Sequence, residues 1–217
     1  MATFVLIHGG GGSSWDWHLL EPELRARGHD VVAVDLPCED EDAGLAEYTD
    51  AVADAIGDRR DLVVVAHSFG GFTATLVPAR LPVRLLVLLT AMIPVPGEPP
   101  ADWWANTGHG SVALPDGDIA QYLHDVPPEL AAEALARSRH QTGASSRAPW
   151  PLAALPDVPT RFLLCRDDRF FPPEFMRRVV SERLGIEPDE IDGSHCVALS
   201  RPAELADRLD RYVREPA

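Results

Sequence analysis

Residues 63–72 read VVVAHSFGGF and contain the feature that decides the fold. The apolar run at the start of this stretch is typical of a strand that is buried on both faces. The run ends at Ala66, and Ser68 then stands between two bulkier residues and is followed closely by Gly70 and Gly71. This pattern is typical of a sharp turn from a strand into a helix, which brings their backbones close and points the serine hydroxyl outward.

Apolar β-rich runs alternate with helical patterns along the chain, which predicts a mainly parallel six-stranded α/β sheet with helices on both faces. The predicted strands span residues 3–7, 30–34, 62–66, 84–89 and 160–164, with a weaker strand at 190–191. The pattern breaks from about 97 to 156, where prolines and small residues are frequent and no β run occurs. A structureless loop of that length would be unusual, so we expect a partly helical insertion within a single domain, residues 1–217.

The composition limits the classes of partner. The chain has 217 residues, 46% of them hydrophobic and 24% charged, which is enough to bury one large core. Its 19 basic residues are all arginine and its 34 acidic residues give a formal net charge of −15. Because no basic cluster could neutralise phosphates, we expect no nucleic acid as a partner.

The cysteines and the amino terminus indicate the compartment. Cys38, Cys165 and Cys196 are odd in number and lack metal-ligand spacing, which favours neither a disulfide framework nor a zinc site. The chain begins without a basic segment or a long apolar one, and no apolar run reaches the length of a bilayer span. We expect a cytoplasmic protein without metal, cofactor or membrane partner, and the sequence leaves a homodimer open.

Three residue types needed for nucleophilic catalysis follow predicted strands. Ser68 follows the third strand, Asp168 the fifth and His195 the last. The carboxyl ends of parallel strands meet at one edge of a sheet, so these side chains are expected to lie together. A serine hydroxyl needs a histidine to accept its proton and a buried carboxylate to orient the ring. Asp167 competes with Asp168 for the role of this carboxylate.

Four glycines follow the first strand, in LIHGGGGSSWDW at residues 6–17. They let backbone N–H groups approach a substrate, and the N–H groups of Gly10 and Phe69 are the best candidates for stabilising an oxyanion. The lysine that a phosphate-binding loop requires is missing. Aromatic residues of the insertion indicate an apolar or aromatic substrate portion, unless they pack the insertion onto the sheet. The candidates for lining the pocket are Gly9, His67, Trp103, Trp104 and Tyr122.

These motifs resemble those of the α/β-hydrolase superfamily over nearly the whole chain. FVLIHGG, AHSFGG, DDRFFPPEF and GSHCVALSRPAEL resemble, more narrowly, the branch of plant methyl-ester esterases, S-selective hydroxynitrile lyases and small bacterial esterases. Ala66 replaces the first glycine of the G-x-S-x-G turn. In this family the catalytic aspartate precedes a proline by four positions, which favours Asp168 over Asp167. The resemblance also implies an α/β-hydrolase fold in which residues 97–156 form a cap over the serine.

The resemblance implies chemistry on an ester. The lyases of this branch carry a lysine directly after the catalytic histidine and a threonine after the histidine of the first motif, whereas Cys196 and Gly9 stand here. Ester hydrolysis is therefore favoured over lyase chemistry. We expect a serine-dependent hydrolase of a small, apolar or aromatic carboxylic ester, acting through an acyl-enzyme. Carbon–carbon bond hydrolysis, lyase chemistry or acyl transfer on the same triad, or a non-catalytic ligand receptor, are the alternatives.

Overall fold

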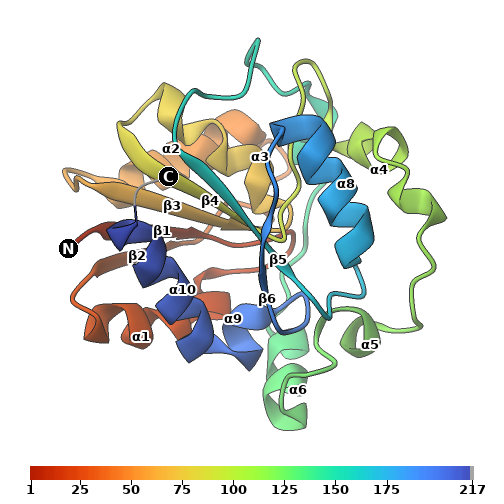
Figure 1. The fold of residues 1–217 in the computed structure, drawn as a ribbon. Helices are drawn as coiled ribbons and strands as arrows, with labels where there is room; N and C mark the ends of the chain where they lie inside the picture. The colour runs from red at the N-terminus through yellow and green to blue at the C-terminus, as the bar shows by residue number, and fades with distance from the viewer. Residues whose placement is uncertain (216–217) are drawn as a thin grey trace.

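A computed structural model describes residues 1–215, so the last two residues of the predicted domain lie outside the described part. Its centre is a six-stranded sheet in which every pair of neighbouring strands is parallel (Figure 1). The strands are β1 Thr3–Ile7, β2 Asp30–Val34, β3 Leu62–His67, β4 Val83–Leu89, β5 Thr160–Cys165 and β6 Asp189–Ile191. The prediction of an α/β fold with a six-stranded sheet is confirmed, with strand bounds within one residue of those expected.

The strand order creates a crevice at the carboxyl edge of the sheet. The order is β2-β1-β3-β4-β5-β6, so the chain winds outward from β1 to β2 and then returns to the other side of β1. The winding direction therefore reverses between β1 and β3. Ligands of open α/β sheets bind at such a reversal point, outside the carboxyl ends of the strands. The glycine-rich loop follows β1 and Ser68 follows β3, so both stand at this position.

Alternating side chains of the strands build two cores, one on each face of the sheet. Val5 and Ile7 of β1 belong to one core, and Phe4 and Leu6 belong to the other, because successive strand residues point to opposite faces. Helices cover both faces in Figure 1. The first core is closed by α2 Leu45–Ile56, α3 Gly70–Ala74 and α8 Pro173–Leu184. The second is closed by α1 Leu20–Ala26, α9 Val197–Ser200 and α10 Pro202–Arg214.

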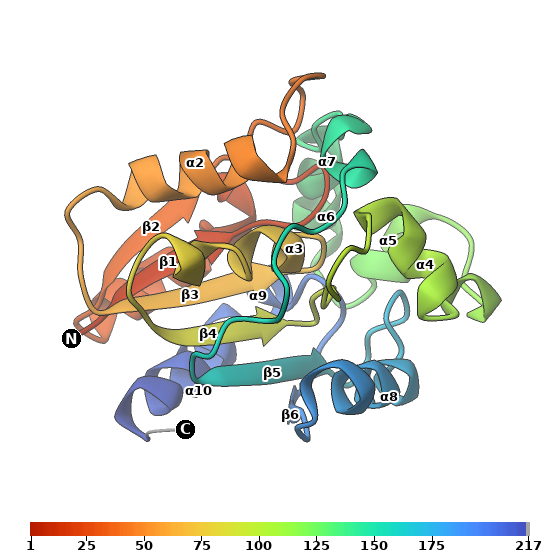
Figure 2. The same ribbon diagram turned by 90° about the horizontal axis from the view of Figure 1, so that it is seen from above.

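The segment between β4 and β5 carries short helices and no strand. Figure 2 shows its helices gathered at the end of the sheet to which the strand arrows point. This segment contains η3 Pro100–Asp102, α4 Trp103–Asn106, η4 His109–Ser111, α5 Asp118–Tyr122, α6 Pro128–Ala136 and α7 Ala144–Arg147. Two further 3-10 turns, η1 Ser14–Trp17 and η2 Val77–Ala79, follow β1 and α3. The helices between β4 and β5 are therefore placed where they can border the crevice.

A buried ion pair ties the start of this segment to α8. Arg183 donates hydrogen bonds of 2.6 and 2.8 Å to the two carboxylate oxygens of Glu98, and one of 2.6 Å to the carbonyl of Ile93. The Glu98 side chain is 1% exposed and that of Arg183 is 9% exposed. Asn106 of α4 donates a further hydrogen bond to Glu98. Glu98, the first acid after β4, therefore has a structural partner and is not available as a catalytic acid.

Within residues 1–215, none of the helices combines the length and apolar character needed to cross a bilayer.

Candidate active site

Ser68 occupies a strained turn directly after β3. Its φ angle is +51°, in the left-handed region that residues with a Cβ seldom adopt. The glycines behind it are required by space: a Cβ on Gly70 would overlap the carbonyl oxygen of His8, and one on Gly71 that of Met92. The turn also accepts a hydrogen bond of 2.9 Å from the Met92 N–H to the Ser68 carbonyl. Close packing of α3 against the strand ends thus holds the serine at the crevice.

His195 and Asp168 form a buried hydrogen-bonded pair beside this turn. Nδ1 of His195 lies 2.8 Å from Oδ2 of Asp168. The carboxylate also accepts hydrogen bonds from the Thr90 hydroxyl at 2.6 Å and from the N–H groups of Phe170 and Phe171 at 2.9 and 2.8 Å. An ionised carboxylate can only accept, so Nδ1 carries the proton and Nε2 of the neutral ring is left as an acceptor. This is the tautomer that a general base requires.

Asp167 has a different partner. Its carboxylate accepts a hydrogen bond of 3.1 Å from the Gly193 N–H, and its own N–H donates to the Gly193 carbonyl at 3.1 Å. These bonds connect the loop after β5 to the loop after β6. Of the two adjacent aspartates, Asp168 alone contacts the His195 ring among the hydrogen bonds of the described chain.

Thr90 supports the same carboxylate and was missed by the sequence analysis. It follows β4 directly, is fully buried, and has a φ angle of +38°. Its N–H donates to the Leu163 carbonyl at 2.8 Å, which fixes the backbone from which the hydroxyl reaches Asp168. The available signal was its position, since a hydroxyl at the carboxyl end of a strand between β3 and β5 must lie near both loops.

His67, the last residue of β3, packs against His195. The two ring centroids are 4.5 Å apart, and Nε2–H of His67 donates to the His195 carbonyl at 2.9 Å. Burial, reinforced by the neighbouring His195, holds the pKa of His67 well below its usual range. The neutral His67 ring therefore positions the backbone of the loop that carries His195.

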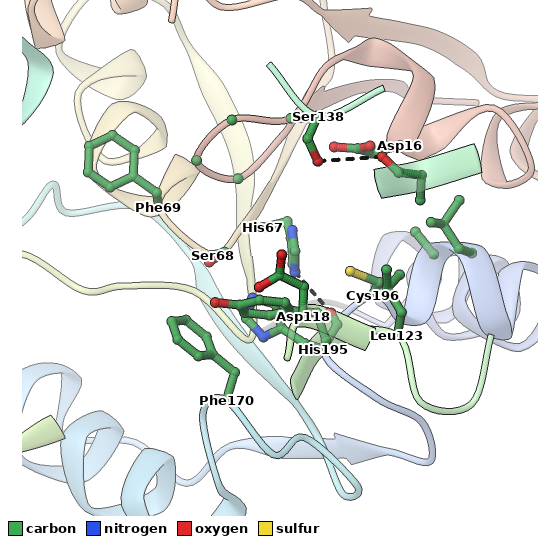
Figure 3. A pocket seen from close by; sticks show the side chains of 18 of the residues that line it. Asp16, His67, Ser68, Phe69, Asp118, Leu123, Ser138, Phe170, His195 and Cys196 are labelled. Carbon is green, nitrogen blue, oxygen red and sulfur yellow. Dashed lines mark hydrogen bonds between the residues drawn. The ribbon is translucent and has the colours of Figure 1, made fainter. Parts of the chain in front are cut away.

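One cavity of about 480 Å³ joins these groups (Figure 3). Ser68, His195 and His67 lie on its wall, whereas Asp168 lies behind His195 and away from the wall. The other predicted residues that line the cavity are Gly9, Gly10, Phe69, Trp104 and Tyr122.

Trp103 does not reach this cavity, contrary to the prediction. Its side chain is fully buried in the core that lies against α8, and its indole N–H donates to the Ile93 carbonyl at 3.1 Å. Successive residues of a helix point about 100° apart, and here Trp103 faces the core whereas Trp104 lines the cavity. Both tryptophans were predicted to line the pocket, because no feature of the neighbouring sequence distinguishes them. The packing of α4 places Trp104 on the cavity wall.

The glycine-rich loop lines the cavity, and two of its backbone N–H groups donate to acceptors within the protein. Gly11 N–H donates to the Gln141 side chain at 3.0 Å, and Gly12 N–H donates to the Gly9 carbonyl at 3.2 Å. Within residues 1–215, no protein group accepts a hydrogen bond from the N–H of Gly10 or of Phe69. These two donors are therefore available to a ligand.

The His8 ring supports the glycine-rich loop through two hydrogen bonds. Its Nε2 accepts the Leu36 N–H at 3.0 Å, so its Nδ1 is the donor to the Gly9 carbonyl at 2.7 Å. Burial lowers the pKa of His8 to about 4, partly opposed by the hydrogen bond to Gly9. The ring is therefore neutral at physiological pH and braces the loop through both nitrogens.

Charged side chains that were not predicted from the sequence also line the cavity. They are Asp16 of η1, Asp118 of α5 and Arg137. The signal for Asp16 was a capping box, in which Ser13 caps η1 and the aspartate three positions later accepts the Ser13 N–H. Within the described residues, no three His, Cys, Asp or Glu side chains converge as a metal site, and Cys38, Cys165 and Cys196 are free thiols.

Comparison with known proteins places the chain in a family. The sequence profile of the alpha/beta hydrolase family matches residues 4–208. The chain is 27% identical to Methylesterase 7 of Arabidopsis thaliana, with 97% of each protein covered. It is 30% identical to probable esterase PIR7A of Oryza sativa subsp. indica, with 97% of this chain and 96% of that protein covered. A crystal structure of polyneuridine aldehyde esterase is similar in fold, with a TM-score of 0.82 at 23% identity over 96% of this chain and 98% of that one. Because the match covers nearly the whole chain, the protein belongs to the alpha/beta hydrolase family.

Proposed function

We propose that the protein is a serine-dependent hydrolase of small carboxylic esters that acts through an acyl-enzyme intermediate. The observation that carries this proposal is the 2.8 Å hydrogen bond between His195 and Asp168, in a cavity whose wall also holds Ser68 on a strained turn. Relatives named as a methylesterase and a probable esterase, covered over nearly their whole length, support ester chemistry.

In the proposed first half-reaction, Oγ of Ser68 attacks the ester carbonyl carbon and His195 Nε2 takes the hydroxyl proton. The carbonyl oxygen becomes an oxyanion that accepts hydrogen bonds from the N–H groups of Gly10 and Phe69. When the carbon–oxygen bond to the alcohol breaks, His195 returns the proton to the departing alcohol. The acyl group then remains on Ser68.

The second half-reaction releases the acid. His195 takes a proton from water, and the resulting hydroxide attacks the acyl carbon while the same two N–H groups stabilise the oxyanion. The bond to Ser68 then breaks, and Oγ recovers the proton from His195. Asp168 stabilises the imidazolium in both halves, and its four hydrogen bonds keep the carboxylate aimed at Nδ1.

The substrate class is inferred from the cavity wall. Residues 97–156 act in this proposal as a cap that contributes Trp104 and Tyr122, and Phe170 adds a third aromatic ring. A cavity of about 480 Å³ fits a small ester, and the aromatic surface favours an apolar or aromatic portion. We also infer that the protein acts in the cytoplasm, in keeping with its three free thiols.

Lyase chemistry is disfavoured by the residue after His195. Burial raises the pKa of the Cys196 thiol, so this side chain is neutral and cannot replace the positive charge of a lysine. Acyl transfer would use the same acyl-enzyme with an alcohol or amine in place of water. It is distinguished by adding an alcohol acceptor and measuring the ratio of new ester to free acid.

The test is turnover of p-nitrophenyl esters of increasing acyl length by wild type, Ser68→Ala and Ser111→Ala. Ser68→Ala should lose at least roughly a thousandfold in kcat because no other group can form the acyl-enzyme. Ser111→Ala is the matched control, since Ser111 is exposed and outside the cavity wall. Mass spectrometry of quenched wild type should show one added acyl group. Wild-type turnover by Ser68→Ala would refute the assignment, and tight ligand binding without turnover would favour a receptor.

A further inference from the structure

Asp16 places a carboxylate in the wall of the cavity that contains Ser68 and His195. Its Oδ2 accepts the Ser13 N–H at 3.2 Å, which closes the capping box of η1. Within residues 1–215, no protein group donates a hydrogen bond to the other carboxylate oxygen, Oδ1. Figure 3 shows Asp16 and Ser138 at one side of the cavity, apart from His195 and Phe170. The carboxylate is thus separated from the reacting centre but shares its cavity.

This carboxylate has no cationic partner in the described chain. Arg137, the one arginine on the cavity wall, is paired with Glu133 at 2.9 Å and lies over the Trp15 ring at 5.0 Å. Asp16 is half-buried, and a carboxylate that is partly withdrawn from water is stabilised by a positive group or by several donors, because its desolvation is otherwise uncompensated. Asp16 has one neutral backbone donor.

The electrostatic surroundings of Asp16 agree with this reading. Burial raises the pKa of Asp16 to about 6, against the Ser13 hydrogen bond, with Asp35 raising it further and His18 lowering it. The nearby Cys196 is a neutral thiol, because burial and Asp16 raise its pKa. The carboxyl group is therefore ionised at neutral pH without a protein counter-charge.

The Asp16 carboxylate packs directly against the glycine-rich loop. A Cβ on Gly12 would overlap Oδ2 of Asp16, and Gly12 does not have a positive φ angle that would require glycine for its backbone. Glycine at this position therefore leaves space for the carboxylate. Gly10, whose N–H is a proposed oxyanion donor, belongs to the same loop, so Asp16 and this donor lie on one short segment.

We propose that Asp16 binds a positively charged nitrogen of the substrate, so that the preferred esters are cationic. This inference rests on the proposed ester hydrolysis and adds the substrate class. The exposed Asp118 carboxylate on the cavity wall adds negative charge, and Trp104 and Tyr122 offer aromatic faces to a cation. The net charge of −15 attracts cations toward the molecule over longer distances.

The experiment compares matched pairs of esters. In the first pair, the acyl chain of a p-nitrophenyl ester ends in a trimethylammonium group or in a neutral tert-butyl group of the same shape. In the second pair, these two groups end the alcohol portion of a butyrate ester. Wild type should prefer the cationic member of at least one pair by roughly tenfold in kcat/KM. Asp16→Asn keeps an oxygen for the Ser13 N–H and should reduce this preference to about twofold or less.

The ratio within each pair cancels a general loss of activity or folded protein. Asp58→Asn is the control, because it removes the same charge from an exposed position outside the cavity wall; it should keep the wild-type ratio. The ratio of wild type should also fall as the pH is lowered through about 6, since protonation of Asp16 removes the charge while a quaternary nitrogen does not titrate.

The outcomes separate the two proposals. Hydrolysis that depends on Ser68, with the same ratio in wild type and Asp16→Asn or with no preference for the cation, overturns the role of Asp16 and leaves the esterase intact. Absence of Ser68-dependent turnover of either member overturns the esterase. In that case, equilibrium binding of the two intact esters to wild type and Asp16→Asn still decides whether Asp16 selects the cation.

Discussion

At the scale of single residues, the candidate site contains two strained backbone positions, each directly after one of two neighbouring strands. Ser68 after β3 and Thr90 after β4 both have φ angles in the left-handed region, at +51° and +38°. Such angles destabilise a residue with a Cβ and persist only where surrounding contacts impose them. Here the contacts are the hydrogen bond of Thr90 to Asp168 and the packing behind Ser68. Of the three non-glycine residues with a positive φ angle within residues 1–215, two therefore belong to the proposed mechanism, and the third, Asp61, lies at the opposite end of β3.

Thr90→Val tests whether the hydroxyl positions Asp168. Valine has the shape of threonine, so the fold should persist, but Asp168 loses one of its four hydrogen bonds. A hydrogen bond to a charged group contributes about 1.5–3 kcal/mol, so kcat should fall roughly tenfold or more with KM little changed. Steady-state kinetics on a p-nitrophenyl ester measures this split. Thr90→Ser keeps the hydroxyl and should retain most of kcat; a kcat of Thr90→Val equal to that of wild type would contradict the positioning role of the hydroxyl.

At the scale of elements, α3 is placed by close backbone contact. Its first two residues, Gly70 and Gly71, approach the carbonyl oxygens of His8 and Met92, which follow β1 and β4. The helix is short, and its five residues are all buried. Its position determines where Ser68 points and where the Phe69 N–H lies, since both residues directly precede it. Packing of one element thus places the proposed nucleophile beside the proposed oxyanion donor.

Gly71→Ala should be strongly destabilising. The added Cβ would overlap the carbonyl oxygen of Met92, which is backbone and cannot rotate away. Overpacking of a rigid core site costs about 1–3 kcal/mol or more, and we expect the upper part of that range. Urea unfolding followed by circular dichroism measures the change. Gly110→Ala is the control, because no atom lies within 4 Å of its added Cβ; equal stability of the two variants would contradict the close-contact account.

At the scale of the whole molecule, several histidines are buried in the neutral form. Burial lowers the pKa of His8 to about 4, of His67 well below its usual range, and also that of His109, whose Nε2–H donates to the Phe170 carbonyl at 2.7 Å. The folded state therefore binds protons more weakly at these rings than the unfolded chain does. Unfolding takes up protons as the pH falls below about 6.5, so stability should decrease from there toward pH 4. Asp16, with its raised pKa, acts in the opposite direction over part of this window.

His8→Asn isolates one of these contributions. Asparagine keeps a donor and an acceptor but does not titrate, so the loss of stability between neutral pH and about pH 4.5 should be smaller by roughly 2–3 kcal/mol than in wild type. The free energy of unfolding in urea at both pH values gives the difference. His140→Asn, at an exposed position, should behave as wild type. A pH dependence unchanged in His8→Asn would mean that His8 is not held neutral by the fold.

The sequence by itself determined the strands, the parallel α/β arrangement and the residues that follow the strand ends, because apolar runs and turn residues act over a few neighbouring positions. It could not choose between Trp103 and Trp104, show Thr90 beneath Asp168, or place Asp16 in the cavity. Each of those depends on segments distant in the chain: α4 packs against α8, β4 lies between β3 and β5, and residues of α6 and α9 complete the cavity that Asp16 lines. Only the tertiary structure brings such segments together, because the orientation and burial of a side chain are set by its neighbours in space.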